Sequence, residues 1–140
     1  DAYCGTGSIA LFLAQKAAKV YGFEVYSEAV KDARHNAAIN GIENVEFIQG
    51  DVGVTLKNLH AIKPDTVVLD PPRKGCDEKV LRQIVRLEPE KIVWVSCNPA
   101  TLARDLKLLA GSGYAVKEIQ PIDMFPQTYH VETVCLLSRK

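Results

Sequence analysis

Two continuous apolar runs on either side of one helical stretch are the feature that most restricts the fold of this chain. The runs are "DTVVLDPP" (65–72), which prolines close, and "KIVWVSC" (91–97). Nearly continuous apolar runs are typical of strands covered on both faces of a parallel sheet. The segment between them, "DEKVLRQIVRLEP" (77–89), has the pattern of a helix. A strand, a helix and a second strand in this order predict an α/β fold with a parallel sheet.

The same alternation continues through most of the chain. Helices are expected over 7–17, 27–41, 52–61 and 100–113, and further strands over 19–25, 44–51, 114–125 and 130–140. Ser27 is expected to cap its helix, and Asn40-Gly41 to end it. Because the last two strands follow one another without a helix, at least one of them is expected to be antiparallel.

Composition favours one compact domain over residues 1–140, since 47% of the 140 residues are hydrophobic. Lysine plus arginine and aspartate plus glutamate both total 17, so the chain has no basic field for long-range attraction of nucleic acid. The four cysteines form no C-x-x-C pair, and we therefore predict no metal site. No signal peptide or membrane-length apolar segment is visible, which favours a reducing, cytoplasmic setting.

A glycine-rich segment at the start of the chain indicates a nucleoside-type ligand. "CGTGSIA" contains Gly5, Gly7 and Ala10 in the G-x-G-x-x-G/A pattern, and Glu24 follows roughly twenty residues later, where an acid can bind ribose hydroxyls. The structural alternative is a tight turn with an exposed glutamate. Asp51, after "FIQG", is a candidate for the adenine side of the pocket or an acidic cap of the next helix.

A cysteine lies at the junction of a predicted strand and a predicted helix. In "VSCNPATLARDL" (95–106), Asn98 suits the helix cap and Pro99 the first turn, which places Cys97 at a helix N-terminus. Such a position favours the nucleophilic thiolate form. The alternative is a buried structural cysteine.

Two acidic residues follow or open other predicted strands. Asp70, in "DPPRKG" (70–75), is held by two rigid prolines, as a catalytic or base-reading group requires. If Val131 of "HVE" points into the core, Glu132 points to the other face of the strand, where it could serve as a general base. The alternatives are a strand-ending turn for Asp70 and a solvated strand end for Glu132.

Four segments in this order resemble the S-adenosylmethionine-dependent RNA (uracil-5-)methyltransferases: "DAYCGTGSIAL", "DPPRKG", "SCNPATLARDL" and "DMFPQTYHVETV". The resemblance implies a Rossmann-like methyltransferase domain, with a mostly parallel seven-stranded sheet and an antiparallel final strand. It implies Cys97 as the nucleophile that adds to carbon-6 of uracil, Glu132 as the base that removes the carbon-5 proton, and Asp70 near the target base. S-adenosylmethionine is the implied cofactor, with contacts at Asp1, Gly5, Gly7, Glu24 and Asp51.

Family members carry upstream sequence, so we expect a catalytic fragment whose first strand is truncated and whose main RNA-binding contacts lie outside this chain. Ribosomal RNA is the expected substrate, with transfer RNA second. Two other functions remain open: an amino-directed methyltransferase, which would leave Cys97 without a role, and a non-catalytic nucleotide-binding module.

Overall fold

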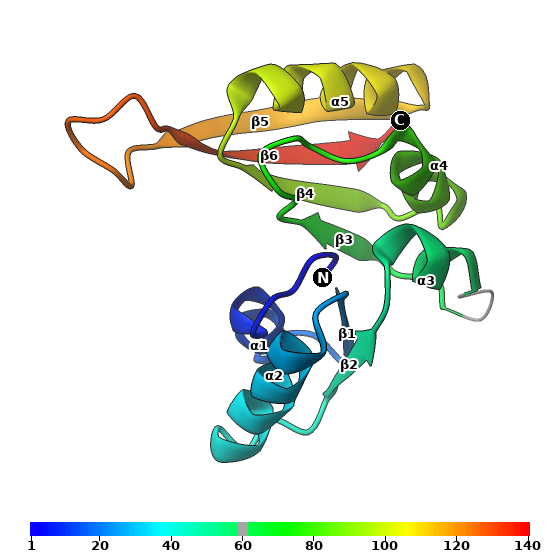
Figure 1. Cartoon of the computed structure of the whole chain (residues 1–140). Coiled ribbons are helices and arrows are strands. Elements are labelled where there is room, and N and C mark those ends of the chain that lie inside the picture. The colour runs from blue at the N-terminus through cyan, green and yellow to red at the C-terminus, as the bar shows by residue number, and fades with distance from the viewer. Residues whose placement is uncertain (59–61) are drawn as a thin grey trace. The chain divides into compact units, whose positions relative to one another are not determined.

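The computed structural model describes residues 1–58 and 62–140 (Figure 1). Internal contacts group the chain into two compact units, unit 1 (Asp1–Asn58) and unit 2 (Leu59–Lys140), which are described in turn. The single domain expected over 1–140 remains a prediction. The elements of unit 1 are α1 (Ser8–Ala14), β1 (Val20–Glu24), α2 (Ser27–Ile39), β2 (Val45–Gln49) and α3 (Val52–Asn58). Those of unit 2 are β3 (Thr66–Leu69), α4 (Glu78–Arg86), β4 (Lys91–Ser96), α5 (Pro99–Gly111), β5 (Tyr114–Ile122) and β6 (Glu132–Arg139).

Unit 1 is built on a parallel pair of strands. β1 and β2 run in register from Val20 beside Val45 to Glu24 beside Gln49, and Ala2 adds a single parallel bridge to Phe23. The Phe47 ring packs directly against the backbone of β1 at Gly22. A Cβ atom added at Gly22 would lie 2.6 Å from this ring, so the position has no room for a side chain. Small residues of α1 and α2 pack in this same cluster.

The start of α2 differs from the prediction. Tyr26 occupies the N-cap position, and Ser27 is the first helical residue, with its hydroxyl donating to Glu28 Oε2 at 2.7 Å. The expected serine cap is therefore wrong. The helix begins one residue earlier because the amides of Val25 and Tyr26 are already turned toward the carboxylate of Glu24. The predicted stop is confirmed, since Asn40 is the C-cap.

Unit 2 contains a four-stranded mixed sheet in the order β3-β4-β6-β5. β3 and β4 are parallel, with Leu69 beside Trp94. β6 lies between β4 and β5 and is antiparallel to both, so the expected antiparallel strand is the last one. The predicted βαβ unit is confirmed as β3, α4 and β4.

Burial in this sheet follows the strand patterns only in part. Val67, Val68 and Leu69 of β3 are all buried, as a strand covered on both faces requires. In β4, burial instead alternates, with Ile92, Trp94 and Ser96 buried on one face. α5 packs on β5 and contacts α4.

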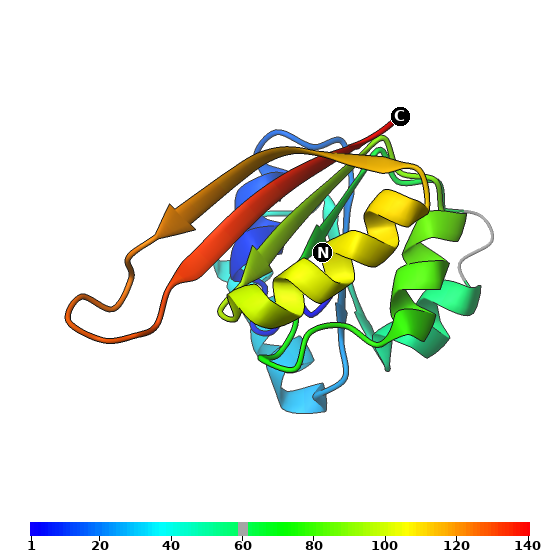
Figure 2. The ribbon, with the colours of Figure 1, turned by 90° about the horizontal axis from the view of Figure 1, so that it is seen from above.

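The hairpin of β5 and β6 extends beyond the other strands of unit 2 in both views of the ribbon (Figures 1 and 2). The helix predicted over 52–61 is observed as α3, and residues 59–61 lie outside the described part of the chain.

Candidate active site

The glycine loop, residues 4–7, is held by the carboxylate of Glu24. Gly5 N–H donates to Glu24 Oε2 at 3.0 Å, and the amides of Val25 and Tyr26 donate to Oε1 at 2.7 and 3.0 Å. Glu24 is only 8% exposed, so the exposed glutamate of the alternative reading is not observed. Gly7, at φ 89°, is the N-cap of α1, a left-handed conformation that glycine adopts at little cost. This acid fixes the loop and retains lone pairs for a further donor.

Cys4, the first residue of this loop, has no sign of chemical reactivity. Its side chain is buried, and burial together with the negative charge of Glu24 raises the pKa of the thiol to about 11. A thiol of this kind stays protonated near neutral pH and is a poor nucleophile.

The carboxylate of Asp1 is the most unusual group of unit 1. Both of its oxygens are buried and have no hydrogen-bond partner among the described residues. The backbone around it is paired, because Phe23 N–H donates to the Asp1 carbonyl at 2.9 Å. A buried carboxylate without a donor is costly, so this arrangement suits a ligand that brings a cation or a hydrogen-bond donor.

Asp51 lies at the start of α3 and caps that helix. Its Oδ1 accepts from Val54 N–H at 3.0 Å, and its carbonyl accepts from Thr55 N–H at 2.8 Å. This is the acidic cap named above as one reading of Asp51. An adenine contact would have to use the part of the exposed carboxylate that the cap leaves open.

Three predicted residues meet at one edge of the sheet of unit 2, and we call them the strand-edge cluster: Asp70, Cys97 and Glu132. Asp70 directly follows β3 and Cys97 directly follows β4, while Glu132 opens β6. Ser96 pairs with Thr133, so Cys97 and Glu132 occupy the next positions along two neighbouring antiparallel strands. Asp70 joins them because the carboxyl ends of parallel strands share one edge of a sheet.

Electrostatics support this proximity. The pKa of Asp70 is raised above its ordinary value, first by burial and second by the negative charge of Glu132. The charge of Glu132 thus acts on Asp70 across the ends of β3 and β6, because a like charge nearby disfavours the ionised form. Alternation along β6 also holds, since Thr133, Cys135 and Leu137 are buried on one face and Glu132 lies on the other.

The helix after Cys97 begins as the sequence predicted. Asn98 is the N-cap of α5, its side chain accepts from Ala100 N–H at 3.1 Å, and Pro99 occupies the first turn. Cys97 itself is only partly buried. The fully buried structural cysteine of the alternative interpretation is therefore not observed at this position, whereas Cys135 is buried in the core.

The DPP loop, residues 70–76, is fastened to α5 by side chains that the sequence interpretation did not single out. Asp105 is 2% exposed, accepts from Cys76 N–H at 2.9 Å and pairs with Arg104 Nε at 2.7 Å. Arg104 also donates to the Lys74 carbonyl at 3.0 Å. Nearer the start of the helix, Asn98 Nδ2 and Thr101 Oγ1 both donate to the Arg73 carbonyl at 3.2 Å.

One glycine makes this attachment possible. Gly75 has φ 77°, and a Cβ atom there would lie within 2.6 Å of the Arg104 and Asp105 side chains. The available sequence signal was Asp105 itself, because it shares the buried face of α5 with Leu102, Leu106 and Leu109. An acid at an apolar-face position of a helix has to find a partner.

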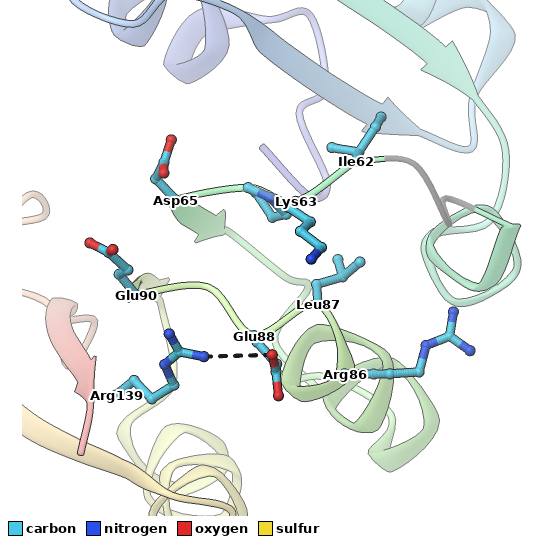
Figure 3. Close-up of a pocket in the computed structure, with 9 residues that line it drawn as sticks. Ile62, Lys63, Asp65, Arg86, Leu87, Glu88, Glu90 and Arg139 are labelled. Atoms are coloured by element: carbon cyan, nitrogen blue, oxygen red, sulfur yellow. Dashed lines mark ion pairs between the residues drawn. The ribbon is translucent and has the colours of Figure 1, made fainter.

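A hollow of about 370 Å³ lies at the opposite edge of the same sheet, where β3 and β4 begin and β6 ends (Figure 3). Charged side chains of both signs surround it, and Arg139 pairs with Glu88 at 3.7 Å. In the described part of unit 2, its lining contains none of the predicted site residues. This hollow is therefore separate from the strand-edge cluster.

Residues 1–58 and 62–140 contain neither a membrane-spanning helix nor a metal-binding group. They contain no helix with the length and apolar character needed to cross a membrane. They also contain no group of three or more histidine, cysteine or acidic side chains arranged to hold a metal ion.

Comparison with sequence families gives two matches. The family described as tRNA (uracil-5-)methyltransferase matches residues 52–140, and a general methyltransferase domain matches residues 1–87. Among curated proteins, an uncharacterized RNA methyltransferase of Bacillus cereus is 57% identical over 141 residues, which cover 99% of this chain and 31% of that protein. The chain thus spans about a third of the length of the curated relatives it matches.

Solved structures give the same fold. The tRNA (uracil-54, C5)-methyltransferase of Pyrococcus abyssi, solved in complex with S-adenosyl-L-homocysteine, has a TM-score of 0.85 at 39% identity, over 98% of this chain and 33% of that one. An rRNA methylase of Streptococcus thermophilus has a TM-score of 0.78 at 16% identity, over 99% of this chain and 84% of that one, a likeness of fold alone. The chain has the Rossmann-like fold of class I methyltransferases.

Proposed function

Because this chain belongs to the tRNA (uracil-5-)methyltransferase family, we propose that it is the catalytic part of a longer enzyme that methylates carbon-5 of a uridine in RNA. The observation that carries this proposal is the strand-edge cluster, where a partly buried cysteine and two carboxylates meet at the ends of three neighbouring strands. These are the groups that such a reaction requires: a nucleophile, a base and a group that holds the target base. A sheet of seven strands remains part of the proposal.

The residues of unit 1 fit S-adenosylmethionine as the cofactor. The orphaned carboxylate of Asp1 suits an ammonium group, and the carboxylate of Glu24 suits ribose hydroxyls. Gly5 and Gly7 would allow close approach of the backbone to the ligand, and Asp51 would face the adenine side. When bound, this cofactor supplies the methyl group from its sulfonium.

In the proposed mechanism, the thiolate of Cys97 adds to carbon-6 of uracil, and the electron pair of the carbon-5–carbon-6 double bond makes carbon-5 nucleophilic. After carbon-5 is methylated, Glu132 takes the proton from carbon-5. The electron pair left behind restores the double bond, and the bond between Sγ and carbon-6 breaks. Asp70 would hold the base, and its pKa is raised above the ordinary value by burial and by the negative charge of Glu132. Because Cys97 lies within a folded site, the target has to leave any base stack first.

The RNA class remains the open part of this proposal. We keep ribosomal RNA as the first candidate, and transfer RNA as the second because the Pyrococcus abyssi relative acts on tRNA. Both RNAs belong in the same assay. A cytoplasmic setting and RNA contacts made by segments outside this chain remain predictions.

The test traps the covalent intermediate in the full-length enzyme. Ribosomal and transfer RNA containing 5-fluorouridine are incubated with the enzyme and S-adenosylmethionine, and the protein is mapped by mass spectrometry. Fluorine cannot leave as a proton does, so an RNA adduct on Cys97 is expected, and Cys97→Ala should lose both adduct and turnover. Methyl transfer that survives in Cys97→Ala would instead favour an amino-directed methyltransferase.

A further inference from the structure

We propose that the tip of the β5–β6 hairpin is a stacking surface for unpaired nucleotides next to the target uridine. We call the three rings that form this surface the ring cluster: Phe125, Tyr129 and His130. The proposal rests on the proposed function and names a part of the RNA-binding surface within this chain. Figures 1 and 2 show the hairpin extending from the sheet of unit 2.

The rings of the cluster contact one another while remaining open to solvent. Tyr129 is 85% exposed and Phe125 is 50% exposed. The ring centroids of Tyr129 and His130 lie 4.2 Å apart, and those of Phe125 and His130 lie 6.2 Å apart with nearly perpendicular planes. Large aromatic side chains gathered in this way on an exposed tip are typical of a binding surface.

The tip is ordered by its own hydrogen bonds. The amide and hydroxyl of Thr128 both donate to the Phe125 carbonyl, at 3.2 and 2.8 Å, and His130 N–H donates to the same hydroxyl at 3.2 Å. Gln127, at φ 67°, completes the turn. A fixed ring arrangement loses less conformational entropy on binding than flexible side chains do.

A cation adjoins the rings. Arg73 Nη1 lies 3.4 Å from His130 Nδ1, which brings this exposed residue of the DPP loop next to the ring cluster. Aromatic faces beside an arginine are the combination that binds single-stranded nucleic acid, because bases stack on the rings and the guanidinium attracts phosphate. An apolar protein partner would not need the cation.

The ring cluster also lies near the chemistry. Glu132 comes two residues after His130, and at about 3.3 Å per residue of extended chain that is a separation of roughly 7 Å. Nucleotides on either side of a uridine bound at the strand-edge cluster could therefore reach the rings. Stacking tolerates any base, so the surface would hold the strand without reading its sequence.

The experiment measures binding of a labelled single-stranded RNA, with a target uridine in its middle, to the full-length enzyme by fluorescence anisotropy. Tyr129→Ala and Phe125→Ala are each expected to raise Kd by about 5- to 150-fold, the range for loss of one stacked base. Tyr129→Phe keeps the ring and should bind RNA like wild type. Tyr129→Leu keeps an apolar side chain without a ring and should bind more weakly than wild type. Ile119→Ala, an exposed apolar residue of the same hairpin, is the matched control and should leave Kd unchanged.

Unchanged Kd in both alanine variants would overturn the proposal. A lowered unfolding midpoint with unchanged Kd would also overturn it, because the tip would then be covered by another part of the enzyme. The 5-fluorouridine adduct is measured on the same samples. If the alanine variants bind RNA like wild type and still form the adduct, the stacking surface is refuted and the proposed function is not. If binding depends on the rings but no adduct forms, the stacking surface is supported and the uracil-5 chemistry is refuted.

Discussion

At the scale of single residues, the strand-edge cluster depends on the proton affinity of its carboxylates. The pKa of Asp70 is raised, with burial as the larger cause and the charge of Glu132 as the smaller one. This shift has a cost in stability that can be measured.

Asp70→Asn is expected to raise the thermal unfolding midpoint at pH 7. Because the folded-state pKa of Asp70 is above the ordinary value of 3.8, the folded chain binds its proton more tightly than the unfolded chain does. The ionised carboxylate therefore destabilises the fold at any pH above the raised pKa, and this destabilisation disappears below the ordinary value. Midpoints of wild type and variant from about pH 3 to pH 8 measure the difference.

Glu132→Gln provides the control for the second cause. Without the charge of Glu132, the gain from Asp70→Asn at pH 7 should become smaller but persist, since burial is the larger cause of the shift. A lower midpoint for Asp70→Asn than for wild type at pH 7 would contradict the assigned direction.

At the scale of elements, α5 does more than present Cys97 at its start. Its first two turns hold the DPP loop through Asn98, Thr101, Arg104 and Asp105, so one helix positions parts of two strand ends. The loop backbone is thereby fixed without a regular element of its own. Asp105 is the buried member of this attachment and the one whose removal leaves an unpaired group.

Asp105→Ala should lower the free energy of unfolding by about 1–3 kcal/mol, the cost of leaving the buried Cys76 amide without an acceptor. Urea unfolding measures the loss, and hydrogen exchange at the Cys76 amide should accelerate. Lys107→Ala, at an exposed position of the same helix, is the control and should stay within about 0.5 kcal/mol of wild type. Equal stability of the two variants would show that Asp105 does not hold the loop.

Sequence reasoning predicted the elements and the strand ends better than the contacts between them. The order of helices and strands, an antiparallel strand among the last two and the Asn98 cap followed from local patterns, while the resemblance implied that the antiparallel strand is the final one. The serine cap of α2 failed because the Glu24 carboxylate, at the end of the preceding strand, accepts from the amides of Val25 and Tyr26 and turns the backbone first. The fastening of the DPP loop by Asp105 could not be predicted, since it joins segments about thirty residues apart.

At the scale of the whole molecule, the residues proposed for cofactor binding and those proposed for catalysis belong to different units. Unit 1 carries the glycine loop, Glu24 and Asp1, which are proposed for the cofactor, and unit 2 carries the strand-edge cluster. Ligand binding and chemistry can therefore be tested by separate substitutions.

S-adenosylhomocysteine is expected to stabilise the full-length enzyme by about 2.7 kcal/mol at a concentration about a hundredfold above its Kd. Asp1→Asn should weaken this stabilisation, because the proposed ammonium contact loses its charge, whereas Cys97→Ala should retain it. Thermal unfolding with and without the ligand is the measurement. Stabilisation by NAD in place of S-adenosylhomocysteine would support a nucleotide-binding module of another kind.

The position of β6 has a consequence for how the protein is made. Ribosomes deliver β3, β4 and β5 before β6, yet β6 is the strand that lies between β4 and β5. The side of β4 that pairs with β6 therefore lacks its partner strand during synthesis, and Cys97 is synthesised well before Glu132. A nascent chain therefore holds the proposed nucleophile without its base, and it gains the proposed activity only once the final strand has emerged and inserted.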